Sequence, residues 1–258
     1  MKADQRQQQI LRILREKGNA TAAFLSKLLG VSEVTIRRDF DVLESNGSIR
    51  RMFGGVILNE TNGYGNSGKL FFDERTSVNE EKKRLIGLCA SKLVHERDAI
   101  YLDIGTTIAA LAVELRERAN IIALTNSLAV LNILSDSSVK LYSIGGCVNG
   151  SEHSINGDVA NSFVRAFNID NAFIGAAGVT LENGISEYFN ETARLRKAVI
   201  ERAKKVTLLA DSGKFGIDRF SVVCPLDNVN TIITDSGLPA AYAERICEMG
   251  IELIFADK

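Results

Sequence analysis

The residues best suited to chemistry stand in three polar turns, each directly after a short apolar stretch of the chain. The turn Asp103–Thr107 runs into a helical stretch, so its backbone amides and two threonine hydroxyls suit a phosphate or another anion. Simple helix capping explains this turn equally well when it is taken alone. The turn Thr125–Ser127 offers an amide side chain, and the turn Asp211–Lys214 offers a carboxylate and an ammonium group. Taken singly, these last two fit surface turns or ion pairs as well as a ligand site.

Alternating strands and helices are expected to bring these turns together. Apolar stretches predict strands at 99–104, 121–124, 140–144, 172–176, 206–210, 231–234 and 251–255, and helical patterns lie at 78–95, 107–118, 158–167, 192–203 and 239–249. This alternation predicts a mostly parallel sheet that helices cover on both faces. Ligands bind at the carboxyl ends of the strands in such sheets, so we expect the three turns to share one pocket.

The N-terminal segment has the pattern of a small DNA-binding domain. Three helices are predicted at 5–17, 21–30 and 32–46, followed by a two-stranded wing at 48–58. The short connection between the second and third helices is typical of a helix-turn-helix. The candidate DNA-contacting residues lie on the third helix and at the start of the wing: Ser32, Glu33, Thr35, Arg37, Arg38, Arg50 and Arg51. An ordinary helical bundle with a charged, solvated face is the alternative.

Charge and composition divide the chain in the same way. Residues 1–55 carry 10 Lys and Arg against 6 Asp and Glu, a net charge of +4, whereas the whole chain carries −1. We therefore expect only the N-terminal segment to bind a polyanion. The polar stretch 59–69, rich in Gly and Asn, reads as a linker or loop. The predicted domains are 1–58, which binds DNA, a linker at 59–76, and an α/β domain at 77–258.

Several classes of protein and site are excluded by composition. With 45% hydrophobic and 24% charged residues, the chain is typical of a globular protein. No apolar run approaches the roughly 18 residues of a membrane span, so we expect a cytoplasmic protein with no membrane partner. The four cysteines are far apart, which predicts neither a disulfide framework nor a metal site. The string Gly63–Lys69 imitates a phosphate-binding loop, but Leu70 lacks the required hydroxyl, so no nucleotide cofactor is predicted.

The string VSEVTIRRDFDVLESNGSIRRMFGG, from Val31 to Gly55, resembles the DNA-binding segment of a known family. That family, the DeoR family of bacterial transcriptional regulators, places S-x-x-T-I-R-R-D in its recognition helix and G-x-x-x-R-x-x-G-G in its turn and wing. Two residues depart from the pattern. Phe40 stands where Leu is usual, which exchanges one core residue for another. Phe53 stands where His is common, which argues against a polar wing contact there.

The resemblance extends through the rest of the chain. The strings LDIGTT, TN, AFIGAAGV and ADSGKFG, together with the Gly145-Gly146 turn, look like the effector domain of the same family. The resemblance implies a fold similar to ribose-5-phosphate isomerase and a phosphorylated sugar as effector. It assigns Gly105, Thr106 and Thr107 to phosphate, and Asp103, Asn126, Glu187, Asp211 and Lys214 to sugar hydroxyls or phosphate. Gly213 replaces a Ser of the family pattern. Arg75 either contacts the ligand or braces the linker, and bracing is the favoured role.

The function predicted from these observations is transcription regulation without enzyme activity. The expected protein is a sequence-specific DNA-binding repressor of a carbohydrate-metabolism operon, and a bound phosphorylated sugar modulates its affinity for the operator. Because one domain reads only a short half-site, we expect a homo-oligomer, a dimer or a tetramer. The alternative is a sugar-phosphate isomerase-like enzyme with a DNA-binding appendage, in which Glu187, Asp211 and Lys214 would supply the base and the cation.

Overall fold

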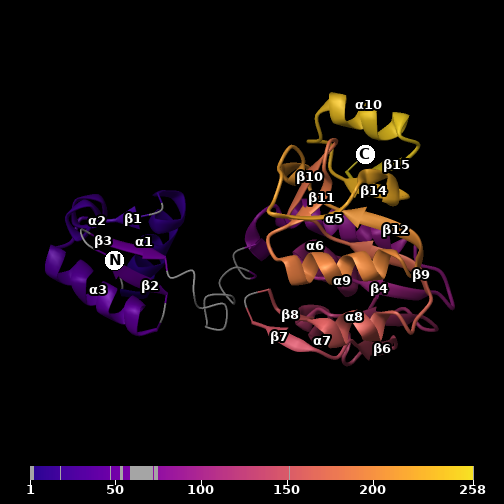
Figure 1. The fold of residues 1–258 in the computed structure, drawn as a ribbon, viewed down its shortest axis with the longest axis horizontal. Helices are drawn as coiled ribbons and strands as arrows, with labels where there is room; N and C mark the ends of the chain where they lie inside the picture. The colour runs from indigo at the N-terminus through magenta and orange to yellow at the C-terminus, as the bar shows by residue number, and fades with distance from the viewer. Residues whose placement is uncertain are drawn as a thin grey trace. The chain divides into compact units, whose positions relative to one another are not determined.

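The computed structural model describes residues 3–17, 19–46, 48–52, 55–58, 72, 75–150 and 152–257. The chain divides into two compact units, Met1–Phe71 and Phe72–Lys258, which are drawn together in Figure 1 and described separately below. Most of the predicted linker at 59–76 lies outside the described residues. The part that is described, Phe72 and Arg75 onward, belongs to the C-terminal unit. The boundaries at 58 and 77 stay predictions.

The N-terminal unit is a winged helix-turn-helix. Its elements are α1 (Ala3–Lys17), β1 (Asn19–Ala20), α2 (Ala22–Leu29), α3 (Glu33–Ser45), β2 (Ile49–Met52) and β3 (Gly55–Leu58), and the strands pair in the order β1-β3-β2. Thr21 caps α2 by accepting the amide hydrogen of Phe24, and Ser32 caps α3 by accepting that of Thr35. A left-handed Gly30, with φ 67°, ends α2. The predicted three helices and wing are confirmed.

Apolar side chains at helical spacing form the core of this unit. Ile36, Phe40 and Leu43 of α3 are buried against residues of α1 and α2. Gly55 lets β3 approach β1 closely, because a Cβ at this position would lie 2.6 Å from the carbonyl oxygen of Ala20. The opposite face of α3 is left exposed by this packing.

The C-terminal unit is built on a seven-stranded sheet in which every neighbouring pair is parallel. Its strand order is β15-β14-β12-β9-β4-β5-β6. The strands are β4 (Ala99–Leu102), β5 (Ile122–Thr125), β6 (Lys140–Ser143), β9 (Ile169–Ile174), β12 (Ala203–Leu209), β14 (Thr231–Thr234) and β15 (Glu252–Phe255). They correspond to the seven predicted apolar stretches, and the predicted α/β class is confirmed.

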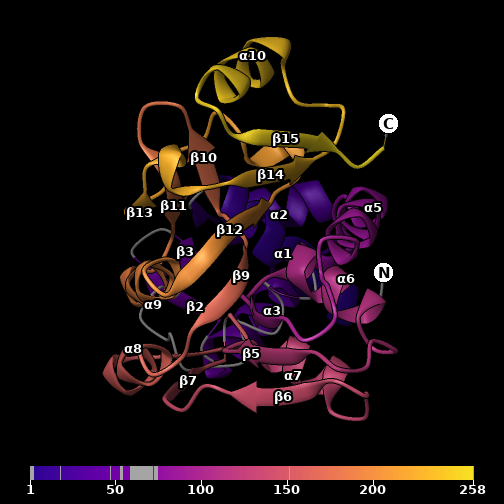
Figure 2. The same ribbon diagram turned by 90° about the vertical axis from the view of Figure 1, so that its right-hand side faces the viewer.

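Helices cover both faces of this sheet, as Figure 2 shows. The helices α5 (Glu80–Ser91), α6 (Thr106–Glu114) and α7 (Leu128–Leu134) bury one cluster of apolar side chains. The helices α8 (Asp158–Val164), α9 (Asn190–Ile200) and α10 (Ala240–Glu248) bury the other. Alternate residues of β4 point to opposite faces, with Ile100 and Leu102 in the first cluster and Tyr101 in the second.

Short elements that sequence patterns did not predict border the main sheet. A hairpin pairs β7 (Cys147–Asn149) with β8 (Ser154–Asn156), and an antiparallel sheet pairs β10 (Gly178–Thr180), β11 (Gly184–Glu187) and β13 (Ser221–Cys224). Two 3-10 helices, η1 (Ser212–Lys214) and η2 (Leu226–Asn228), complete the unit. Unlike the short strands of the main sheet, most of these strands carry polar residues or glycine and form no continuous apolar stretch, so the sequence pattern did not reveal them. No helix among the described residues has the length and hydropathy to span a membrane.

Candidate functional site

A cavity of about 360 Å³ lies in the C-terminal unit, beside the carboxyl ends of β4 and β12. Six of the eight predicted effector residues line it, namely Gly105, Thr106, Thr107, Glu187, Asp211 and Lys214. The first and third polar turns therefore meet, as expected for the carboxyl edge of a parallel sheet. The second turn, which carries Asn126, does not line the cavity.

The turn after β4 presents the first turn of α6 to the cavity. Gly105 is the N-cap residue, and its φ of 115° is a conformation that favours glycine. No side chain caps this helix end, so the first amides of α6 keep their hydrogen-bonding capacity toward the cavity. Thr106 and Thr107 add two hydroxyls. An anion is the ligand that such an arrangement stabilises.

The turn after β12 is held rigidly by buried carboxylates. Asp211 accepts a hydrogen bond from the amide of Gly213 at 3.1 Å and from Nδ2 of Asn79 at 2.9 Å. Asp235, at the end of β14, accepts the amide of Ser212 at 2.7 Å and is paired with Nζ of Lys82 at 2.7 Å. This bracing fixes the backbone of η1 and leaves the Lys214 ammonium with no hydrogen bond or ion pair to another described residue.

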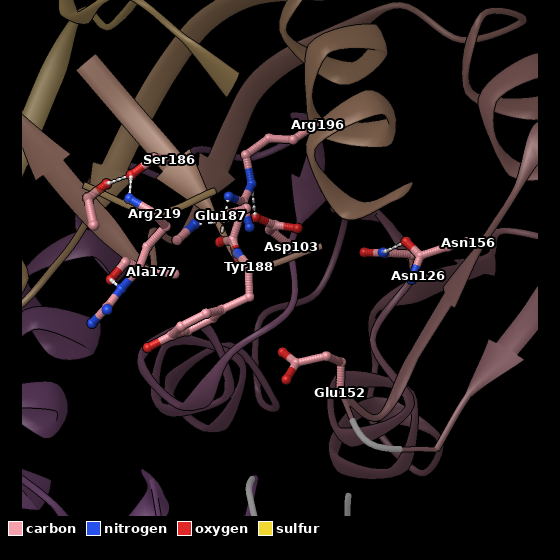
Figure 3. Close-up of polar contacts among 12 residues, drawn as sticks. Asp103, Asn126, Glu152, Asn156, Ala177, Ser186, Glu187, Tyr188, Arg196 and Arg219 are labelled. Carbon is pink, nitrogen blue, oxygen red and sulfur yellow. Dashed lines mark hydrogen bonds and ion pairs between the residues drawn. The ribbon is translucent and has the colours of Figure 1, made fainter. Parts of the chain in front are cut away.

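A buried ion triad forms the floor beside the cavity (Figure 3). Nε of Arg196, on α9, donates to Oδ2 of Asp103 at 2.6 Å, and its Nη1 donates to Oε1 of Glu187 at 2.7 Å. The Arg196 side chain is 1% exposed. Burial raises the pKa of Asp103 above its usual value, and Arg196 counteracts part of that rise. Burial alone would lower the pKa of Arg196, but the two carboxylates raise it, so the guanidinium stays charged.

Two predicted effector residues act behind the cavity wall. Asp103 is 1% exposed and does not line the cavity, because its carboxylate is taken by Arg196 and by the amide of Gly175. Asn126 accepts a hydrogen bond from Oη of Tyr101 at 2.7 Å and donates to the carbonyl oxygen of Ile155 at 3.2 Å. Both side chains have internal partners and neither lines the cavity, so their roles in effector binding stay predictions.

Five further polar residues of the cavity lining were missed or interpreted differently from the sequence: Arg75, Asn79, Lys83, Glu152 and Arg196. Glu152 and Arg75 form an ion pair at 3.1 Å, in which the Glu152 side chain is 7% exposed. Burial raises the pKa of Glu152, and Arg75 opposes this rise. Arg75 lines the cavity as well as pairing with Glu152. The sequence signal that could have found Lys83 is a cation at an inward-facing position of a helix.

The predicted DNA-contacting residues lie on the exposed side of α3 and on β2. Glu33, Arg37 and Arg38 are exposed, and Arg37 is paired with Glu33 at 3.3 Å, a distance typical of a weak surface pair. Arg51 is paired with Asp41 and Glu44 of the same unit. The Arg50 side chain lies outside the described residues. The roles of these residues in DNA binding stay predictions.

A buried carboxylate in the N-terminal unit, that of Asp39, fixes the orientation of α3. Asp39, on its inner face, accepts hydrogen bonds from Nε of Arg6 at 2.5 Å, from Nη2 of Arg6 at 3.1 Å and from Nε2 of Gln7 at 3.1 Å. The Asp39 side chain is 4% exposed. Both donors lie on α1, so this cluster ties α1 to α3 across the core.

Comparison with solved structures finds resemblance at low identity. The ribose 5-phosphate isomerase A of Methanocaldococcus jannaschii matches 53% of this chain and 55% of its own, with 20% identity and a TM-score of 0.41. The translation initiation factor eIF-2B of Pyrococcus horikoshii OT3 matches 89% of this chain and 86% of its own, with 17% identity and a TM-score of 0.44. Likeness of this size carries no argument about activity.

Curated relatives match almost the whole chain. A protein of Escherichia coli O157:H7, named as a candidate repressor of the aga operon, is 31% identical over 97% of this chain and 93% of its own length. The transcriptional repressor GlcR of Bacillus subtilis is 31% identical over 96% of this chain and 95% of its own. The transcriptional regulator IolR of the same organism is 30% identical over 92% and 93%.

Family sequence models match both units. The model described as the DeoR-like helix-turn-helix domain matches residues 6–62, and the one described as the DeoR C terminal sensor domain matches residues 78–236. The first range covers the winged helix-turn-helix from Arg6 onward, and the second covers the α/β unit as far as Ser236, before α10 and β15. The chain therefore belongs to the DeoR family of transcriptional regulators, with a DNA-binding domain followed by a sensor domain.

Proposed function

We propose that this regulator represses a carbohydrate-metabolism operon, and that a phosphorylated sugar in the cavity of the C-terminal unit modulates its affinity for the operator. The observation that carries the effector part is the pairing of two features in one cavity. Among the described residues, no side chain caps the first turn of α6 and none pairs with the ammonium of Lys214, and both groups line the cavity. The carboxylates of Glu152 and Glu187 line the same cavity.

The hydrogen-bond donors and the carboxylates that line the cavity suit the phosphate and the hydroxyl groups of a phosphorylated sugar. Backbone amides, threonine hydroxyls and an ammonium all donate hydrogen bonds to phosphate oxygens. Carboxylates accept hydrogen bonds from sugar hydroxyls, and Asp211 offers a third acceptor at the edge of the phosphate end. The names of relatives that repress an aga operon or carry the name GlcR support a carbohydrate-linked operon for this chain.

The same contacts favour a sensor over an isomerase. Isomerisation of a sugar phosphate needs a carboxylate base that is free to take a proton from the substrate carbon. Among the described residues, each carboxylate that lines the cavity already has a partner: Glu187 has Arg196, Glu152 has Arg75, and Asp211 has Asn79. These partners hold each carboxylate as a fixed acceptor, which suits recognition without turnover.

The DNA-binding part is assigned to the exposed face of α3 and to β2. Ser32, Glu33 and Thr35 occupy the first turn of α3, where a recognition helix approaches base edges, and Arg37 and Arg38 follow. One such unit reads a short half-site, so we infer a homo-oligomer, a dimer or a tetramer. Since the operator is chromosomal, we place the protein in the cytoplasm.

A ligand screen followed by a DNA titration tests the proposal. The full-length protein is screened by thermal shift against ribose 5-phosphate, glucose 6-phosphate, fructose 6-phosphate and other phosphorylated sugars, with the free sugars as controls. Any sugar phosphate that raises the midpoint is then titrated into complexes with DNA fragments that the protein selects from its own genome. We expect one sugar phosphate to change the affinity for DNA and to remain chemically unaltered. Turnover at ordinary enzyme rates, or no selected fragment at any salt concentration, contradicts the proposal.

A further inference from the structure

The segment that immediately follows the predicted linker forms part of the cavity wall. Arg75, Asn79 and Lys83 all line the cavity, within nine residues of each other. They also bind the C-terminal unit through polar contacts, since Arg75 pairs with Glu152 and Asn79 donates to Asp211. A ligand that fills the cavity would therefore contact the stretch of chain that follows the predicted linker.

Lys83 is the residue of this segment that is most deeply buried. Only 6% of its surface is exposed, yet its side chain lines the cavity. Its ammonium donates a hydrogen bond to the backbone carbonyl oxygen of Arg75. An ammonium group has three donor hydrogens, so this single bond leaves it further capacity.

The position of Lys83 relative to the first turn of α6 is fixed by close helix packing. One turn beyond Lys83, Gly87 lets α5 approach α6, because a Cβ there would lie 2.7 Å from the carbonyl carbon of Ala110. Ala110 in turn lies one turn beyond Thr106. Lys83 and Thr106 are thus held at corresponding positions on two packed helices, and both line the same cavity.

Positive charge is concentrated around Lys83. Lys214 and Arg75 line the cavity with it. Burial lowers the pKa of Lys83 to about 8. The carboxylates of Asp211 and of Glu80, on the same helix, oppose this shift, whereas the cations Lys214 and Arg75 add to it. Four cations, Arg75, Lys83, Arg196 and Lys214, line the cavity together with three carboxylates, those of Glu152, Glu187 and Asp211. Burial destabilises the charged form of Lys83, so an anion beside its ammonium would stabilise that form.

We propose that Lys83 is an additional effector-binding residue, which bridges an anionic group of the ligand and the carbonyl oxygen of Arg75. This inference rests on the proposed function for its biological meaning, but its chemistry concerns only the anion. The ligand class is one that carries a phosphate dianion. Lys83 joins the first turn of α6 and Lys214 as the third side of the phosphate site.

The bridge supplies a physical link between the cavity and the segment at Arg75. With a dianion bound, the ammonium is held in its charged form, and a hydrogen bond from a charged donor to the Arg75 carbonyl is stronger than one from a neutral amine. The ligand therefore favours the conformation in which Arg75 is held on the C-terminal unit. Such a difference in affinity between two conformations is what a ligand needs to shift their balance.

Inorganic phosphate and the full-length chain provide the direct test. The variant Lys83→Met keeps the length and apolar stem of the side chain but removes every donor, and Lys92→Met makes the same change at an exposed position after α5. Phosphate affinity is measured by calorimetry and thermal shift at pH 7.5, and amide hydrogen exchange of residues 75–83 is followed with and without phosphate. Lys83→Arg tests whether a charged donor restores binding.

We expect Lys83→Met to weaken phosphate binding about tenfold or more, since it removes a charge-assisted hydrogen bond, and Lys92→Met to leave it unchanged. Phosphate should slow exchange at residues 75–83 in the unaltered protein and in Lys92→Met, but not in Lys83→Met. Equal phosphate affinity in Lys83→Met and the unaltered protein overturns the inference, as does an unaltered protein that binds no phosphate. Slowed exchange in Lys83→Met overturns the bridge to Arg75.

The outcome is separable from that of the proposed function. If Lys83→Met loses phosphate binding but no sugar phosphate changes DNA binding, the anion site stands and the regulatory proposal fails. If a sugar phosphate alters DNA binding of Lys83→Met with unchanged potency, the regulatory proposal stands and the role of Lys83 fails.

Discussion

Nε of Arg196 lies 2.6 Å from Oδ2 of Asp103, with both side chains almost completely buried beneath the candidate effector cavity. Arg196 also pairs with Glu187, so one guanidinium contacts two carboxylates, from β11 and from the turn after β4. The pair thereby ties α9, the main sheet and the antiparallel sheet together at the place where the cavity wall is made.

Replacing Arg196 by Met should destabilise the protein strongly. The substitution leaves two buried carboxylates without their cation, which costs about 3–5 kcal/mol in comparable buried pairs. Denaturant unfolding of the full chain measures the loss. Arg194→Met is the matched control on the same helix, because its exposed pair with Asp158 contributes only about 0–1 kcal/mol. Equal stability of the two variants would show that the triad does not hold the cavity wall.

The Arg196 variant should also recover stability at low pH. Burial raises the pKa of Asp103 in the folded state above the unfolded value, and without Arg196 nothing offsets that rise by charge. The unfolded state then loses its protons first as pH rises, so the stability deficit grows upward from about pH 4 and shrinks below it. Unfolding curves at several pH values, compared with those of the unaltered protein, measure this change, and a deficit that is constant with pH contradicts the interpretation.

Arg38→Ala should weaken specific DNA binding by roughly 1–3 kcal/mol if this guanidinium contacts a base edge. Its side chain is exposed on α3, and it forms no ion pair with another described residue. Fluorescence anisotropy with a selected genomic fragment and with random duplex gives both affinities. The control is Arg84→Ala, which removes an exposed arginine of the C-terminal unit. Unchanged affinity of Arg38→Ala for the selected fragment would refute its role.

Lys214→Ala and Thr106→Ala should leave DNA binding intact and abolish the response to the sugar phosphate. Both residues line the cavity, and neither belongs to the DNA-binding unit. Each loses one donor to the phosphate, and the unaltered fold is checked by the unfolding midpoint. A normal effector response in both variants places the phosphate site elsewhere.

Phosphate affinity should fall as pH rises through about 8, the value to which burial lowers the pKa of Lys83. A bound dianion raises the pKa of this ammonium, so binding above that pH takes up a proton and weakens by up to about tenfold per pH unit. Calorimetry in two buffers of different ionisation enthalpy measures the proton uptake. Lys83→Met should take up no such proton, and the same uptake in this variant assigns the titration to another group.

Most of the fold followed from periodicity, whereas half of the site did not. The apolar stretches of the main sheet and the capping residues Thr21 and Ser32 have local signals that packing left unchanged. The turns at Gly105 and Lys214 met because parallel strands end at one edge. By contrast, Arg196 and Glu152 are single charged residues whose partners lie far away in sequence, so only the tertiary structure reveals their burial. The sequence shows that Asn126 is polar, but it does not show that Tyr101 donates a hydrogen bond to its side chain.

The hydrogen bonds from α1 to Asp39 make the orientation of α3 depend on residues of α1. Arg6 and Gln7 hold α3 through Asp39, so a substitution at either position removes a contact that orients the outer surface of α3. We therefore expect substitutions in α1 to alter operator preference while the recognition motif itself stays unchanged.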